Sequence, residues 1–403
     1  MPTANEQILD AMIMRQIGLL RFSHGVARDA IRLLNESEKD LREILERRLQ
    51  YLAGRGITGA DFKSERFTAM LAAIAAAREE VFKDIYGSLR EEMLSLVKSQ
   101  ATYVTSGYTA AAPVVFDMVK PAAAQLLALV NHNPFQGATL KDWAASIQKQ
   151  DIARITNAIR IGLTQGESIP EITRRVVGLQ ALGGKNGATQ LTRNQWTSLT
   201  RTAVNSFSNE ARRLTLDANA DLFTEEVFVA TLDERTTLVC ASFDGKRFAV
   251  GQGPRPPLHW GCRSLRVAIV TPELIGERPF KPFTELQFLR EFAAAQGIPV
   301  VSKRYNLPRG LRVDFDKFAR ARARELIGQV PARTSFQEFL SRQSATFKRD
   351  YLGDTRAALF TKGDLSLSDL IDGAGRPLTL EQLAKMEAAA FRAAGLDPER
   401  FAA

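Results

Sequence analysis

The spacing of apolar residues changes after Asp221, and this change determines the fold class that the sequence predicts. Upstream, apolar residues recur every three or four positions, as they do across residues 41–52, which is typical of amphipathic helices. Downstream, three short runs rich in β-branched and aromatic residues predict strands at 226–232, 247–250 and 265–270. Helical patterns return toward the C-terminus. We therefore predict an α+β fold that is mostly α-helical, with long N-terminal helices, a small mixed β-sheet module in the middle and a helical C-terminal part.

Several helices have recognisable ends in the sequence. The helix that carries the apolar repeat is expected to stop at the two glycines of residues 54–56, and a second long helix is expected from about Phe67 to Val97. Two more helices are expected at 143–166 and 192–219. Capping-box patterns, in which a hydroxyl residue precedes a Glu or Gln by three positions, mark helix starts at 168–171, 335–338 and 379–382.

A turn-rich stretch at residues 131–137 indicates a domain boundary. With 403 residues the chain is long enough for two or three domains that each bury a core. We predict a helical N-terminal domain at 1–135, an α+β module at 136–275 and a basic, mainly helical C-terminal domain at 276–403.

Several classes of protein are not expected. No apolar run is long enough to span a bilayer, and the first residues lack the basic and apolar regions of a signal peptide. Two cysteines cannot form a disulfide framework, which favours synthesis in a reducing compartment. The glycine-rich stretch 178–187 lacks the Gly-Lys-Ser/Thr ending of a phosphate-binding loop and follows no strand, so we predict no nucleotide site there.

The formal net charge of +9 is concentrated in one segment. Residues 303–324 hold eight basic side chains and two acidic ones. The basic residues are Lys303, Arg304, Arg309, Arg312, Lys317, Arg320, Arg322 and Arg324. One interpretation is a solvated helix face, and the other is contact with DNA phosphates, which would be independent of sequence and sensitive to salt.

The stretch from Asp233 to Arg266 holds both cysteines of the chain and one of its three histidines. Cys240, His259 and Cys262 are candidate zinc ligands, because a His-x-x-Cys spacing suits two ligands on one turn. Ser264 stands where a further cysteine would complete a Cys-x-Cys pair. Two alternatives remain open, namely a disulfide between the cysteines and plain packing of two buried thiols beside a structural histidine.

Other residues of this stretch have predicted mechanical roles. Asp233 and Arg235 can hold a turn together through a charge-assisted hydrogen bond. Asp244 and Gly245 form a dipeptide that favours a type I′ hairpin turn. Arg263 is expected to pair with an acidic residue of the same stretch. These roles describe a stable fold and need no catalysis.

The residues Asp233-Glu-Arg-Thr-Thr, Cys240, Phe243-Asp-Gly-Lys246 and His259-x-x-Cys262-Arg-Ser264 together resemble the central motif of phage head-morphogenesis proteins. These are minor head (minor capsid) proteins of tailed bacteriophages, also called Mu F-like. Stretches on both sides resemble the same proteins, so the resemblance covers roughly residues 140–385. Many members end this motif with Cys-Arg-Cys, and Ser264 departs from that pattern.

The resemblance implies a structural virion protein with no enzymatic activity and no cofactor beyond the candidate zinc. It would be made in the bacterial host cytoplasm and lie in the capsid interior near the portal vertex, without membrane contact while in the virion. Implied partners are the portal protein, the major capsid or scaffolding protein and packaged double-stranded DNA. It would assist head assembly, DNA packaging or ejection, with residues 1–135 facing portal or capsid and the basic segment near DNA.

Two alternatives belong to other classes of function. One is an ADP-ribosyltransferase-like enzyme, which would need a catalytic Glu-x-Glu turn, and the triplet found is Glu36-Ser37-Glu38 in a helical region far from the predicted sheet. The other is a non-specific DNA-binding protein without a phage connection.

Overall fold

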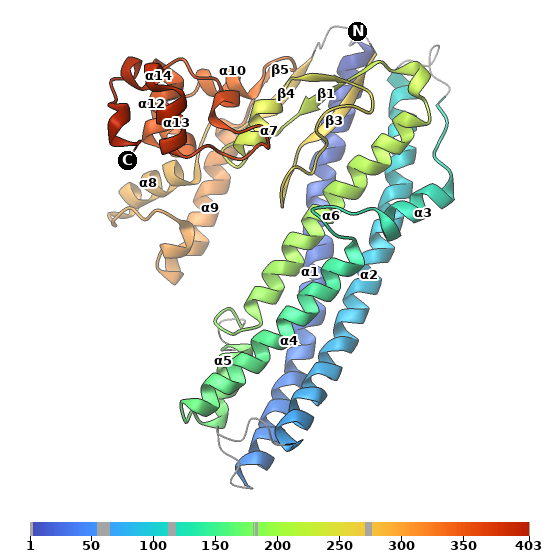
Figure 1. The fold of residues 1–403 in the computed structure, drawn as a ribbon, viewed down its shortest axis with the longest axis vertical. Coiled ribbons are helices and arrows are strands. Elements are labelled where there is room, and N and C mark those ends of the chain that lie inside the picture. The colour runs from blue at the N-terminus through green and yellow to red at the C-terminus, as the bar shows by residue number, and fades with distance from the viewer. Residues whose placement is uncertain are drawn as a thin grey trace.

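The computed structural model describes residues 3–54, 65–111, 118–179, 181, 184–270 and 276–402. The described chain forms a long helical stalk, residues 3–219, and a more compact lobe, residues 220–402, at one end of it (Figure 1). The predicted α+β fold class is confirmed, with long N-terminal helices, a small sheet in the middle and helices after it.

Four long helices lie along the stalk, and two shorter ones pack beside them (Figure 1). The long helices are α1 (Ala4–Ala53), α2 (Glu65–Ala111), α4 (Leu140–Thr164) and α6 (Gln190–Asp217), and the short ones are α3 (Ala123–His132) and α5 (Ile169–Val177). The apolar repeat of α1 is buried against its neighbours, as its period requires. α1 ends directly before Gly54, whereas the rest of the predicted break, residues 55 and 56, lies outside the described residues.

A buried polar cluster joins the four long helices. The Arg78 guanidinium of α2 donates to Asp151 of α4 at 2.7 Å and to the Ser37 hydroxyl of α1 at 2.9 Å. Thr192 of α6 donates to the other carboxylate oxygen of Asp151. Because buried polar groups need partners, this cluster favours one alignment of the four helices over others.

The glycine-rich stretch between α5 and α6 is used for close packing. Gly178 and Gly184 have φ angles of 77° and 70°, in the region that favours glycine. A side chain on Gly187 would collide with the backbone of Val177 and Gly178. Gly183, also part of this stretch, lies outside the described residues.

The central sheet has the strand order β2-β1-β3, with both neighbouring pairs antiparallel. Its strands are β1 (Glu225–Val229), β2 (Arg247–Ala249) and β3 (Leu265–Ile269), close to the predicted runs. Val227 and Val229 pack with the ends of α1 and α2, whereas Phe228 packs with both cysteines on the other face. The sheet therefore has the ends of α1 and α2 on one face and the cysteines on the other, as alternation along a strand dictates.

A second, two-stranded sheet was not predicted. Its strands, β4 (Glu277–Phe280) and β5 (Gly328–Pro331), also pair antiparallel. The predicted sheet was mixed, that is, with both parallel and antiparallel pairing. Within the described part of the chain, the parallel pairing is one isolated bridge between Leu232 and Phe280.

Helices complete the lobe around these sheets. They are α7 (Leu238–Phe243), α8 (Glu285–Gln296), α9 (Arg309–Leu326), α10 (Phe336–Ser341), α11 (Ala345–Leu352), α12 (Asp354–Lys362), α13 (Leu380–Met386) and α14 (Ala388–Ala393). The capping boxes predicted at 168–171, 335–338 and 379–382 begin α5, α10 and α13. α8 and α9 share a small phenylalanine-rich core of their own.

The lobe is held to the stalk by several contacts. The Tyr108 hydroxyl at the end of α2 donates to the carbonyl of Ala268 in β3 at 2.9 Å. The backbone amide of Val270 donates to the Asn5 side chain in the first turn of α1 at 2.8 Å. One hydrophobic core of the stalk includes residues of α1, α2, α3, α4 and α6. The predicted segments 1–135 and 136–275 therefore share a core. The domain limits stay a prediction. Among the described helices, none has the length and apolar character needed to cross a bilayer.

Candidate functional site

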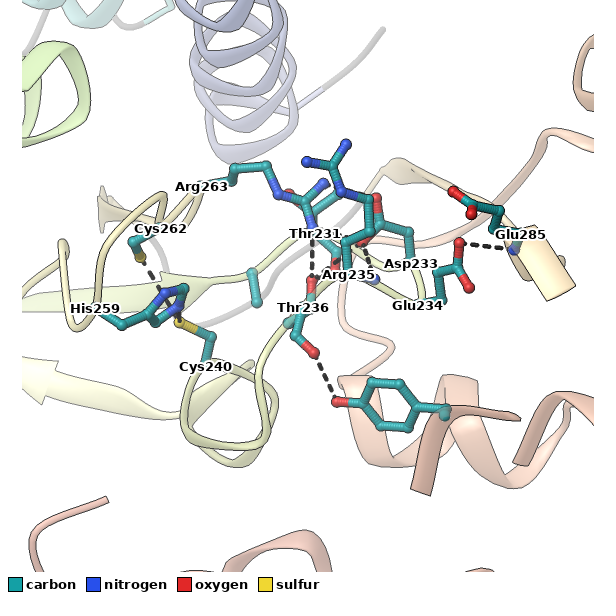
Figure 2. A network of polar contacts seen from close by, with 12 residues as sticks. Thr231, Asp233, Glu234, Arg235, Thr236, Cys240, His259, Cys262, Arg263 and Glu285 are labelled. Atoms are coloured by element: carbon teal, nitrogen blue, oxygen red, sulfur yellow. Dashed lines mark hydrogen bonds and ion pairs between the residues drawn. The ribbon is translucent and has the colours of Figure 1, made fainter. Parts of the chain in front are cut away.

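Cys240, His259 and Cys262 meet on the face of the central sheet opposite the one that packs with the ends of α1 and α2 (Figure 2). Cys240 lies in α7, and the other two lie in the loop 250–264 that leads into β3. The Cys240 sulfur is 3.3 Å from His259 Nε2 and 3.7 Å from the Cys262 sulfur. Both thiols are buried and free, so the disulfide alternative is absent from the structure.

The backbone fixes the proton position on His259. Its Nδ1 lies 3.0 Å from the carbonyl oxygen of Trp260. A carbonyl oxygen can only accept a hydrogen bond, so Nδ1 carries a proton, and in the neutral ring Nε2 turns its lone pair toward the Cys240 sulfur. The hydrogen bond between the two thiols, together with burial, raises the pKa of Cys240. The same hydrogen bond lowers the pKa of Cys262.

Asp233 and Arg263 form a bidentate ion pair beside this cluster (Figure 2). Two hydrogen bonds of 2.6 Å join the guanidinium to the two carboxylate oxygens, so Asp233 is the acidic partner that Arg263 was predicted to have. Arg235 contributes its backbone amide, which donates to Asp233 at 3.1 Å and closes the predicted turn. Burial alone would raise the pKa of Asp233, but the hydrogen bonds and charge of Arg263 outweigh it and lower that pKa.

The predicted hairpin at Asp244 and Gly245 is wrong. Asp244 has a φ of −57° and Gly245 a φ of 80°, whereas a type I′ turn needs positive φ at both residues. The dipeptide instead connects α7 to β2. The Asp244 side chain is buried, accepts from the Ala230 amide at 2.7 Å and pairs with Arg278 of β4 at 3.0 Å. Its role is therefore to join the two sheets.

A second buried carboxylate, Glu226 of β1, binds two arginines. Arg255 of the loop 250–264 lies 2.8 Å from it, and Arg266 of β3 lies 3.0 Å from it. Asp233, Asp244 and Glu226 thus each neutralise at least one guanidinium inside the lobe. Such pairs hold the loop and strands in place because breaking them would leave a buried charge without a partner.

The loop 250–264 also docks on the stalk. The Gly261 amide donates to the Thr202 hydroxyl of α6 at 2.9 Å. The Trp260 ring packs edge-on against Trp143 of α4, with ring centroids 4.9 Å apart. Beside this contact lies an open cavity of about 390 Å³, whose lining includes His259 and three arginines, Arg201, Arg235 and Arg263. The cluster therefore borders a cationic, solvent-accessible cavity.

The family model described as phage Mu protein F like protein matches residues 153–266, which run from within α4 to the first residues of β3 and include Cys240, His259 and Cys262. The middle of this chain is a phage Mu F-like module. This stretch is similar to a family of phage head-morphogenesis proteins. No curated protein and no solved structure matches the chain significantly.

The basic segment lies outside the Mu F-like module, in and before α9, and most of its charges have partners. Arg304 pairs with Asp316, Arg322 with Glu291 and Glu325, and Lys317 with Asp314. Arg312 and Arg320 donate to backbone carbonyls. Lys303, Arg309 and Arg324 are exposed, and their side chains form no ion pair or hydrogen bond within the described residues.

Sequence reasoning did not find Glu226, Arg278 or Trp260 as parts of the Mu F-like module and its surroundings. Glu226 carries a weak signal, because a glutamate inside a predicted strand with one buried face needs a basic partner. Arg278 and Trp260 carry none, since their partners Asp244 and Trp143 are distant in sequence.

Proposed function

We propose that this chain is a structural minor head protein of a tailed bacteriophage. It lies inside the capsid near the portal vertex, after synthesis in the host cytoplasm, and assists head assembly, DNA packaging or ejection. The match of residues 153–266 to the Mu F-like family carries this proposal. Its partners are the portal protein, the major capsid or scaffolding protein and packaged DNA.

The shape of the chain supports an architectural role. α1 has 50 residues and α2 has 47, and both extend along the stalk from the lobe to its far end (Figure 1). The buried cluster around Arg78 and Asp151 fixes the alignment of these helices. A long, rigid stalk with a lobe at one end presents two separated surfaces to neighbouring proteins, as an assembly component requires.

The use of charged residues supports a role without catalysis. Asp233, Asp244 and Glu226, the buried acids of the module region, are bound to arginines. The triplet considered for ADP-ribosyl transfer lies on α1 in the stalk, where Glu36 pairs with Arg32 and Glu38 with Arg193. An enzyme of that type would need its glutamate beside the sheet.

The non-specific DNA contact rests on three cations. Lys303, Arg309 and Arg324 are exposed, and none of them forms a close ion pair within the described residues. Free cations can replace counterions on phosphates, whereas cations already paired within the protein contribute less. The DNA contact is therefore proposed for these three residues and not for all eight of the segment.

Asymmetric electron cryo-microscopy of particles of the phage that encodes this chain tests the proposal. We expect density for the stalk in a few copies beside the portal, and detection of the chain by mass spectrometry in purified heads. Particles that lack the chain, with the protein recovered free in infected cells, would contradict a virion role. Incubation of the purified chain with NAD⁺ should release no nicotinamide, and steady release would instead support the enzyme alternative.

A further inference from the structure

We propose that Cys240, His259 and Cys262 bind one Zn²⁺ ion through two thiolates and an imidazole, with water as the fourth ligand. The proposal is independent of the virion role, which stands whether or not the metal is found. Within the described part of the chain, these are the residues whose side-chain ligand atoms come together as a candidate metal cluster, all within 4.8 Å of one another.

The distances between the ligand atoms fit tetrahedral zinc. With Zn–S bonds of about 2.3 Å and a Zn–N bond of about 2.0 Å, tetrahedral angles place two sulfurs about 3.8 Å apart and sulfur and nitrogen about 3.5 Å apart. The measured separations are 3.7 Å between the sulfurs and 3.3 Å between the Cys240 sulfur and His259 Nε2. Two of the three separations therefore match the tetrahedral values, and the third, between the His259 ring and the Cys262 sulfur, is at most 4.8 Å.

The histidine is already oriented as a ligand. Its Nδ1 proton is held by the Trp260 carbonyl, which in the neutral ring leaves the lone pair of Nε2 directed at the Cys240 sulfur. Metal-binding histidines almost always have their second nitrogen bound in this way. Plain packing of two thiols would not require this orientation of the ring.

The charges also balance. Two thiolates neutralise Zn²⁺, so the occupied cluster adds no net charge to the buried face of the sheet. Thiolate and imidazole ligands in a tetrahedral set select zinc over the harder ions magnesium and calcium.

The cavity beside His259 supplies an entry path and a source of the fourth ligand. It has a volume of about 390 Å³, is open to solvent and is lined by His259. The Ser264 hydroxyl contacts the Cys240 sulfur, but a hydroxyl is a poorer zinc ligand than a thiolate. Water in place of a fourth protein ligand gives a three-ligand site, which binds zinc less tightly than a closed four-ligand site.

Zinc binding would join α7 to the loop 250–264. That loop contains no regular secondary structure and docks on the stalk through Gly261 and Trp260. An ion bound by Cys240 of α7 and by His259 and Cys262 of the loop would therefore fix the loop residues Trp260 and Gly261 against the stalk.

Metal content tests the proposal directly. We expect the full chain, purified without a polyhistidine tag and under reducing conditions, to contain about one zinc per molecule, and Cys262→Ser to retain below about a tenth of that amount. His132→Ala serves as the matched control, because His132 is exposed at the end of α3 and should not change the zinc content. Ser264→Cys should slow the removal of zinc by a chelator.

Cobalt provides a readout that does not depend on any variant folding. Co²⁺ added to the metal-free wild-type chain should give a thiolate-to-cobalt charge-transfer band and the visible absorption of a tetrahedral site. A wild-type chain with no more zinc than Cys262→Ser and no such band would overturn the proposal. A mass lowered by two hydrogens, which reports a disulfide, would overturn it as well.

Discussion

Arg78 and Asp151 form an ion pair of 2.7 Å at the centre of the stalk, where both side chains are almost completely excluded from solvent. They belong to α2 and α4, and Ser37 of α1 and Thr192 of α6 bind the same pair. The four long helices of the stalk therefore share one buried polar contact point.

Asp151→Ala should destabilise the chain strongly. The substitution leaves the Arg78 charge buried without its partner, which costs about 3–5 kcal/mol in comparable buried pairs. Urea-induced unfolding followed by circular dichroism measures this loss. Arg32→Ala is the matched control, because its pair with Glu36 is exposed and should cost below about 1 kcal/mol. Equal losses in the two variants would show that the buried cluster does not hold the helices together.

Asp233 should contribute a stability that is lost in acid. Its pKa in the folded state is lowered by Arg263, so its contribution is full above the unfolded pKa of about 3.9 and disappears as the pH falls through the folded pKa. The difference in unfolding free energy between the wild type and Asp233→Asn should therefore shrink as the pH is lowered from about 6 to about 3. A difference that stays constant over this range would contradict the assigned ion pair.

Two Gly→Ala substitutions should have opposite effects. At Gly187 the new methyl group would meet the backbone of Val177 and Gly178, so the turn between α5 and α6 must shift and the chain loses stability. At Gly87, inside α2 and with open space around it, alanine should stabilise the helix by up to about 1 kcal/mol. Thermal unfolding of both variants provides the comparison, and a stable Gly187→Ala chain would refute the packing explanation of this stretch.

Removal of three unpaired cations should weaken the salt dependence of DNA binding. Each phosphate contact contributes about 0.9 to the slope of log K against log salt concentration, so replacing Lys303, Arg309 and Arg324 by alanine should lower the slope by up to about 3. Fluorescence anisotropy with duplex DNA at several salt concentrations measures it. The control replaces Arg304 and Arg322, which are paired within the protein and should change the slope less. An unchanged slope in the triple variant would favour the solvated-face interpretation.

The parts of the fold that depend on local sequence could be predicted. Capping boxes place the starts of helices, and the β-branched runs gave the three strands of the central sheet nearly to the residue. β4 and β5 could not be predicted, because Gly328–Pro331 has a weak strand pattern and its partner lies about 50 residues earlier. Long-range pairing creates these strands, and a local pattern does not report it.

In the candidate site, too, local features could be predicted and long-range contacts could not. The grouping of Cys240, His259 and Cys262 followed from their rarity and spacing in the sequence, and the structure brings them together. A turn forms at Asp244 and Gly245, closed by the Lys246 amide on the Phe243 carbonyl, but it is not the predicted type I′ hairpin. The buried ion pair of Asp244 with Arg278, 34 residues away, was not visible in the local sequence. Partners that complete a buried charge are selected by the tertiary fold, which a single sequence does not specify.

The 50 residues of α1 form one continuous helix, which at 1.5 Å per residue is about 75 Å long. Its first turn is bound to the end of β3, and its last turns pack with α5 near the opposite end of the stalk. A force applied at one end is therefore passed to the other with little bending. In an assembled particle, the length of α1 would set the distance between the proteins that bind the two ends of the stalk.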